Sequence, residues 1–201
     1  MKKILALVLV LLFTVSCISA FAEEADDEYE VIDLGDTKYE QILQQKGILV
    51  KKEYIDIGVF TNSKPSYNSE EIASQMAIVT EVSTGDETYA LRLVYSYDNG
   101  KYDKGSYVDV LDYDELEGII SALEAFKTGF TNSETTHTEF EYISFSGFHL
   151  AAIYDGEYNI YLQFNSSSKD MPTQLVTITF DQIDALIEFF KQAKAGMEAR
   201  M

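Results

Sequence analysis

Residues 111–129 read LDYDELEGIISALEAFKTG, and residues 178–196 read ITFDQIDALIEFFKQAKAG. The two stretches align without a gap at an offset of 67 residues, which pairs Asp114 with Asp181. Most of the other pairs exchange residues of the same kind, such as tyrosine with phenylalanine and leucine with isoleucine. The chain is therefore organised around one stretch that occurs twice.

Each copy carries the signals of an amphipathic helix. Asp112 can cap the first helix and Glu115 completes a capping box, and the second copy has Thr and Gln at the same offsets. Apolar residues then recur at the i, i+3, i+4, i+7 spacing of one buried helical face. They are Leu116, Ile119, Ile120, Leu123 and Phe126, then Ile183, Leu186, Ile187, Phe190 and Ala193. Gly129 and Gly196 follow where a left-handed C-cap is expected.

The segments upstream of each copy read as strands. Apolar alternation and turn residues predict strands at 48–60, 76–82, 88–97 and 106–111, and again at 139–145, 148–154, 158–164 and 175–178. The triplet Glu-Tyr-Ile occurs at 53–55 and again at 141–143, which suggests that the repeat includes the first strand of each series. Residues 61–73 contain a proline and several Ser and Asn, and we expect a loop there.

Two further expectations concern local structure. Thr37 and Glu40 form a capping box for a short helix at 37–46, which Gly47 would end. Extending the repeat upstream without a gap places Asp109 opposite Val176, which breaks the inward apolar pattern. We therefore expect a β-bulge or a one-residue shift before one of the helices.

The pattern predicts an α+β fold of two tandem ββββα units, 48–129 and 139–196. Each unit is an antiparallel sheet followed by one amphipathic helix, and a pseudo-two-fold relates the two within a single globular domain at 37–201. This element order resembles the PUR-repeat and Whirly-type folds, in which two such units pair and each helix packs on sheet surface. The resemblance implies the fold alone, because no motif of those families is present and their nucleic-acid binding needs basic faces.

Residues 1–22 have the features of an export signal. Two lysines precede an apolar core that is too short to span a bilayer comfortably, and 20–22 form an A-x-A cleavage site. A second interpretation stays open, because residues 14–17 resemble a lipobox in which Cys17 would be acylated. We expect an exported protein, periplasmic or extracellular, anchored to a membrane if Cys17 is lipidated, with no transmembrane helix in the mature chain.

The chain is strongly acidic. It holds 34 acidic and 15 basic residues, a formal net charge of −19, and the leader contributes two lysines and no acid. Residues 23–36 open with the run EEADDEYE, which predicts a solvated tether. Nucleic acid and anionic lipid both require a cationic surface, so the charge argues against them as partners. Cys17 is the only cysteine, so the mature chain forms no internal disulfide.

No catalytic or metal-binding motif is present in the sequence. His137 and His149 are the only histidines, and neither belongs to an HExxH or His-x-His pattern. Carboxylates cluster at the start of the first helix, namely Asp112, Asp114, Glu115 and Glu117. Acids there suit the helix dipole, and the second copy replaces two of them with Thr179 and Gln182, so capping is favoured over acid–base chemistry. We predict no catalytic residue, metal ligand or cofactor.

Tyrosine is the most suggestive residue type, with 14 copies and no tryptophan. Tyr54, Tyr142 and Tyr161 fall on the strand phase opposite the aliphatic residues, and Phe140 joins them. Such an aromatic face can bind a protein, a peptide or a glycan, unless the helix of the other half covers it. These four residues are the candidate binding residues of the sequence.

The sequence as a whole predicts an exported, non-enzymatic binding module of unknown ligand. Two alternatives remain open. One is a hydrolase-type enzyme whose carboxylates meet only in three dimensions, which requires a concave pocket lined by two or more of them. The other is a structural protein of the cell envelope.

Overall fold

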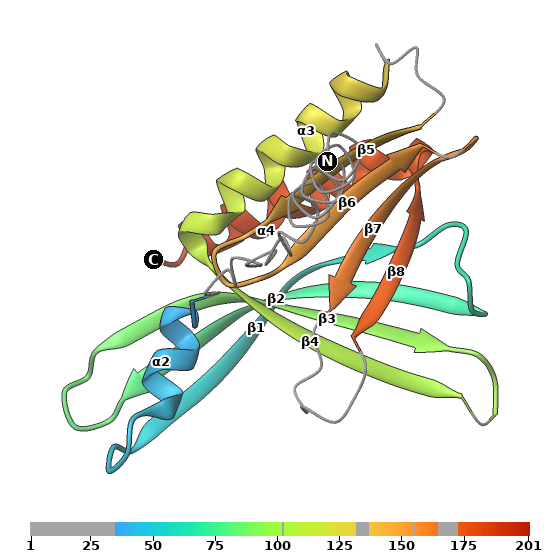
Figure 1. The fold of residues 1–201 in the computed structure, drawn as a ribbon. Helices are drawn as coiled ribbons and strands as arrows, with labels where there is room; N and C mark the ends of the chain where they lie inside the picture. The colour runs from blue at the N-terminus through green and yellow to red at the C-terminus, as the bar shows by residue number, and fades with distance from the viewer. Residues whose placement is uncertain (1–34, 102, 132–136, 155, 165–172) are drawn as a thin grey trace, which may run out of the picture. The chain divides into compact units, whose positions relative to one another are not determined.

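The computed structural model describes residues 35–201 except 102, 132–136, 155 and 165–172 (Figure 1). The predicted leader, Cys17 and most of the predicted tether lie outside the described residues. The first unit comprises α2 (Lys38–Gln44), β1 (Val50–Thr61), β2 (Ser69–Glu81), β3 (Glu87–Asp98), β4 (Lys104–Asp112), the 3₁₀ turn η1 (Tyr113–Glu115) and α3 (Leu116–Thr131). The second comprises β5 (Thr138–Ile143), β6 (His149–Tyr154), β7 (Tyr158–Phe164), β8 (Gln174–Thr179), η2 (Phe180–Gln182) and α4 (Ile183–Glu198).

The described strands form two antiparallel four-stranded sheets, each in sequence order. Sheet A is β1-β2-β3-β4 and sheet B is β5-β6-β7-β8. A helix follows each sheet along the chain, so the predicted α+β fold of two tandem ββββα units is confirmed. The short helix α2 is also present, with the predicted capping box between Thr37 and Glu40.

The two long helices are exchanged between the units (Figure 1). Helix α3 contacts β5 and β6 of sheet B, and α4 contacts β1 and β2 of sheet A. All ten residues of the two predicted apolar stripes are buried, at most 5% exposed, in one core with the inner faces of both sheets. Each unit thus supplies the helix that covers the other unit's sheet.

Three ion pairs on the solvent side of α3 and α4 follow the same pseudo-symmetry. They are Glu117 with Lys194 (2.5 Å), Asp184 with Lys127 (2.6 Å) and Glu124 with Lys191 (2.8 Å). The repeat offset converts the first pair into the second and maps the two members of the third onto each other. Because all six side chains are more than a quarter exposed, these pairs add little to the stability of the fold, but their arrangement shows its pseudo-symmetry.

The repeated glycines have a role different from the predicted one. Gly129 and Gly196 lie inside α3 and α4 and have ordinary negative φ, so the expected left-handed C-caps are wrong. A Cβ at Gly129 would overlap Cζ of Phe140 on β5. A Cβ at Gly196 would lie 2.7 Å from Cγ2 of Ile57 on β1. The repeat keeps glycine where each exchanged helix crosses the first strand of the other sheet.

Strand β2 begins inside the segment predicted as a loop. It starts at Ser69, and its inward residues include Glu70 as well as Ile72, both 2% exposed. Because the inward residue Glu70 is acidic, the apolar alternation that would predict a strand is interrupted in the sequence. The buried carboxyl group has local hydrogen-bond partners, because Glu70 accepts from the Asn62 side chain (2.6 Å) and from the Ser66 backbone N–H (3.2 Å).

Two register expectations are also corrected. The β3–β4 and β7–β8 ladders have no shift, and Asp109 keeps its inward position while half-buried. The shift lies in β1, between Asp56 and Gly58. The Glu-Tyr-Ile triplets are out of phase: Tyr54 faces away from the main core, whereas Tyr142 faces into it. A displacement of one residue exchanges the two faces of a strand.

Candidate functional site

Sheet A has an inner face that packs in the core and an outer face that is covered at one end only. Helix α2 packs on one end of the outer face, where Tyr39 forms a small cluster with Ala77, Val79 and Ala90. Beyond α2 the strands continue with partly or largely exposed side chains. We define the outer face of sheet A as Tyr54, Asp56, Val59, Thr61, Glu71, Ala73, Gln75, Arg92, Val94, Ser96, Ser106 and Val108.

An apolar row crosses all four strands in the middle of this face. The ladders place Val59 beside Ala73, Ala73 beside Val94, and Val94 beside Val108. Val59 is 59% exposed, and the other three are half-buried. The next row holds only Thr61, Glu71, Ser96 and Ser106, all exposed. Apart from Glu71, the side chains of these two rows are small or β-branched, so they project little from the sheet.

A polar network borders the row on the α2 side. The hydroxyls of Tyr39 and Tyr54 are 3.1 Å apart, and the Arg92 guanidinium lies 5.0 Å from the centre of the Tyr54 ring. Arg92 donates to the side-chain oxygen Oε1 of Gln75, and the side-chain nitrogen Nε2 of Gln75 donates to Asp56 (2.7 Å). Burial, and then the hydrogen bond with Tyr54, raise the pKa of Tyr39, so its hydroxyl stays protonated. The network holds Arg92 in place at the edge of the apolar row.

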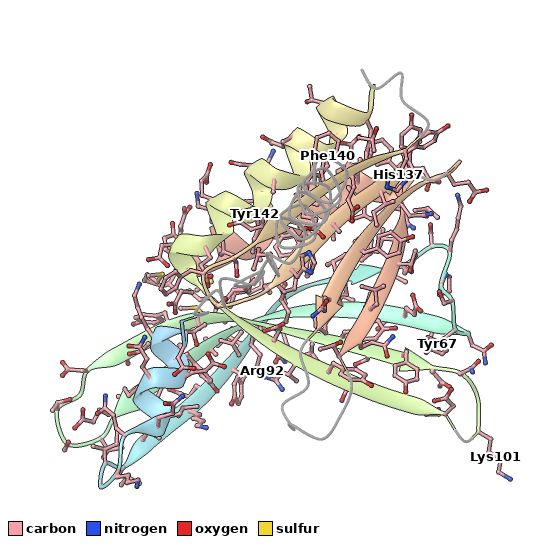
Figure 2. The ribbon with its side chains drawn as sticks, in the orientation of Figure 1. Tyr67, Arg92, Lys101, His137, Phe140 and Tyr142 are labelled. Atoms are coloured by element: carbon pink, nitrogen blue, oxygen red, sulfur yellow. The ribbon has the colours of Figure 1, made fainter. Side chains whose placement is uncertain are left out.

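The structure does not gather the four predicted binding residues on one surface. Figure 2 labels two of them, Phe140 and Tyr142, beside α3. Phe140 and Tyr142 lie under α3, where Phe140 packs at 5.2 Å from Phe130 between ring centres. The alternative that the other half's helix covers the aromatic face describes these two. Tyr54 lies on the outer face of sheet A, 46% exposed, and Tyr161 lies on the outer face of sheet B.

Sequence reasoning missed Arg92, Val94 and the apolar row. A signal was present in residues 88–97, where the residues that alternate with Tyr89, Leu91, Leu93 and Tyr95 are mixed in polarity. One of them is Arg92, and the whole chain contains only two arginines. The aromatic residues of the segment drew attention to the phase that is buried.

Three carboxylates of the acidic cluster at the start of α3, those of Asp112, Asp114 and Glu115, line a cavity of about 540 Å³. Its lining includes Asp36, Lys38, Gln41, Asp112, Asp114, Glu115, Tyr142 and Phe145. Both carboxylate oxygens of Asp112 accept from the Lys38 N–H, each at 3.1 Å, at the first turn of α2. Glu115 accepts from the N–H of Asp112 (2.8 Å) and from the N–H of Ser146 in the β5–β6 turn (2.7 Å).

These carboxylates therefore join segments of the fold. Asp112 fixes α2, and Glu115 ties the start of α3 to the sheet that α3 covers. Burial raises the pKa of Asp112, an effect that the Lys38 N–H opposes. Burial, and then the charge of Glu115, raise the pKa of Tyr142. The Glu115 half of the first capping box is confirmed.

The second copy builds the same joint with neutral groups. The side-chain oxygen of Gln182 accepts from the Ser63 backbone N–H (2.8 Å). Its side-chain nitrogen donates to the side chains of Asn62 (3.0 Å) and Thr179 (3.1 Å). Thr179 makes no side-chain capping bond, so the predicted second capping box is wrong. Gln182 is hydrogen-bonded to the β1–β2 loop of the other unit, just as Glu115 is hydrogen-bonded to the β5–β6 turn.

Each of the two histidines lies near one glutamate, and the two pairs are separate. The His149 ring is 3.6 Å from Glu141, and that of His137 is 3.9 Å from Glu139. Within the part of the chain that the structure describes, no group of three or more His, Cys, Asp or Glu could hold a metal ion. Among the described helices, none has the length and apolar character needed to cross a membrane.

Comparison of the chain with protein-family models, with curated proteins and with solved structures gave no match. The function is therefore inferred from the geometry of the outer face of sheet A and of the acidic cavity.

Proposed function

We propose that the protein is an exported, non-catalytic binding module, and that it holds a protein partner on the outer face of sheet A. The observation that carries the proposal is the apolar row Val59–Ala73–Val94–Val108, which crosses four long strands beside an ordered polar network. Apolar side chains that are at least partly exposed and gathered in one row, with polar residues around them, are typical of a protein interface.

The network supports binding in a second way. Arg92 is already held between the Tyr54 ring and Gln75, so a partner would not have to order a free arginine. Ordering such a side chain on binding costs about 0.5–1.5 kcal/mol. Arginine and tyrosine are also the residue types over-represented among the energetically important residues of interfaces.

The acidic cavity supports a second candidate, the hydrolase-type enzyme. It collects four carboxylates, more than the two that this alternative requires, but Asp112 and Glu115 already accept backbone hydrogen bonds with both oxygens. Asp114 pairs with Lys38 at 3.0 Å and its side chain is 68% exposed, so it is more available than Asp112 and Glu115. A hydrolytic activity that is lost in Asp114→Asn while the melting temperature is kept would favour this candidate over the binding module.

A capture experiment tests the proposed function. The mature protein is immobilised and exposed to envelope extract and spent medium of the source organism. The variant Val59→Lys/Val94→Lys places two charges in the apolar row. The control, Val82→Lys/Leu175→Lys, places them at two apolar positions elsewhere, 53% and 52% exposed, which are about as accessible as Val59 and more accessible than Val94.

We expect a protein captured by the wild type and the control but lost by the row variant, with all three equally folded by circular dichroism. Equal capture by the row variant would refute the assignment of this face. Circular dichroism matters because Val94 lies on a central strand, where a lysine must reach past its neighbours to solvent.

A further inference from the structure

We infer that the partner on the outer face of sheet A is a second copy of this chain, in a weak two-fold dimer with the two outer faces packed together. The inference rests on the proposed function of this face and adds the identity of the partner. Two properties of the face carry it, the placement of its charges and the small size of most side chains in its two central rows, and its area limits the strength of the dimer.

The charges are self-complementary. Arg92 on β3 and Glu71 on β2 lie diagonally across the midpoint between Ala73 and Val94. Glu71 pairs with Ser96, four residues along β3 from Arg92, so their Cα atoms are about 14 Å apart from strand spacings alone. That is too far for an ion pair within one chain, and among the described residues Glu71 is exposed with no hydrogen-bond or ion-pair partner.

A two-fold axis in the plane of the face brings the two charges together. An axis that bisects the line between Arg92 and Glu71 sets Arg92 of each copy opposite Glu71 of the other, as an isologous interface requires. On ideal strand spacings this axis makes the strands of the two sheets cross at about 40°. Aligned sheets pack at an angle of about 30° in magnitude, so the crossing angle that the charge pairing requires is of similar size.

The remaining residues fit this arrangement. The axis passes between Ala73 and Val94 and close to the line of the apolar row, so the row of one copy covers the row of the other. The neighbouring Thr61, Ser96 and Ser106 are small enough for two sheets to approach to about 10 Å. Arg92 uses its described hydrogen bond on Gln75, and the rest of its planar fork can meet a carboxylate.

Area and net charge set the strength. Four strands at about 4.8 Å and roughly seven residues of length give a face of about 450 Å², below the roughly 800 Å² per partner of a standard interface. Two chains of net charge −19 also repel each other at long range. We therefore expect a reversible dimer in the micromolar range or weaker that salt strengthens, because the repulsion is screened more than the buried pairs are.

Sedimentation velocity of the mature chain at about 10–500 µM, at about 20 and 300 mM NaCl, tests the inference, since these salt levels bracket strong and weak screening. The single reversals Arg92→Glu and Glu71→Arg should each weaken the dimer about ten-fold or more, as expected for a lost interfacial charge pair. Mixing the two single variants should restore association. In that heterodimer the two reversed charges attract each other across one half of the interface, and the native pair forms across the other. A general loss of structure cannot produce this rescue. Glu157→Arg, an exposed reversal outside the face, is the control.

The outcomes separate the two proposals. A wild type that stays monomeric over the whole range, or single variants that do not rescue each other, overturns the dimer. If the row variant Val59→Lys/Val94→Lys nevertheless loses a captured protein, the binding face stands with a different partner. If the dimer forms and both capture and dimerisation are unaffected by the row variant, both assignments of this face are wrong.

Discussion

Gly196→Ala tests the close crossing of α4 over β1. The added Cβ would lie 2.7 Å from Cγ2 and 3.3 Å from Cγ1 of Ile57. Ile57 is branched at Cβ and has few rotamers, so it cannot easily swing away. Overpacking of this kind costs about 1–3 kcal/mol, whereas Gly to Ala in a helix interior gains about 1 kcal/mol. We expect a net loss of about 1 kcal/mol, or a melting temperature lower by about 2–4 °C.

Urea denaturation of Gly196→Ala, Ile57→Ala and the double variant measures the coupling between the two positions. Ile57→Ala removes the opposing atoms, so in that background Gly196→Ala should stabilise by about 1 kcal/mol, a coupling of about 2 kcal/mol. Ser121→Ala, at an exposed position of α3, reports the ordinary gain in helix propensity. A Gly196→Ala change that is stabilising to the same extent in both backgrounds would refute the close packing of the exchanged helix.

Three further predictions concern residues that join separate segments of the fold. Glu115→Gln and Gln182→Glu should each lower the free energy of unfolding by about 1–3 kcal/mol in urea at about pH 7. The first change places an amide N–H against a backbone N–H, and the second places a carboxylate oxygen against the side-chain oxygen of Asn62. Unchanged stability of both variants would contradict the assigned partners. The raised pKa of Asp112 means that the folded state binds its proton more tightly than the unfolded state, so this group stabilises most at low pH. The stability of the wild type relative to Asp112→Asn should therefore fall as pH rises from about 4 to 6, and a rise would count against a buried carboxyl. Gly118→Ala should change the melting temperature little although its Cβ would overlap the Tyr142 hydroxyl, because that end of the side chain borders the acidic cavity and can move; a large loss would show that it is fixed.

The helices and the tandem build could be predicted because their signals are local. The apolar spacing of each repeat names the buried stripe directly, and every stripe residue is in the core. The role of the repeated glycines could not be predicted. A glycine after the last apolar residue looks the same whether it ends a helix or allows a crossing, and only the position of Ile57 or Phe140 against it decides between them.

The candidate site was the harder part, because it depends on the register of a sheet. The identical Glu-Tyr-Ile triplets suggested that Tyr54 and Tyr142 share a face, yet one faces outward and the other inward. Sequence identity over three residues does not fix strand phase, and a shift of one residue reverses it. The docking of α2 on Asp112 was equally hidden, because it joins residues 74 positions apart through a backbone N–H.

The exchange of helices is the central structural claim, since it decides which sheet faces are covered and leaves the outer face of sheet A accessible. Zero-length carbodiimide cross-linking of the unmodified protein, read by mass spectrometry, tests it directly on the native ion pairs. The exchanged arrangement predicts a cross-link between Lys64 in the β1–β2 loop and Asp181 in η2, just before α4, because α4 covers sheet A; the link should form within one chain in a mixture of unlabelled and nitrogen-isotope-labelled protein. Absence of this link, while exposed pairs such as Lys104 with Asp98 still react, would contradict it.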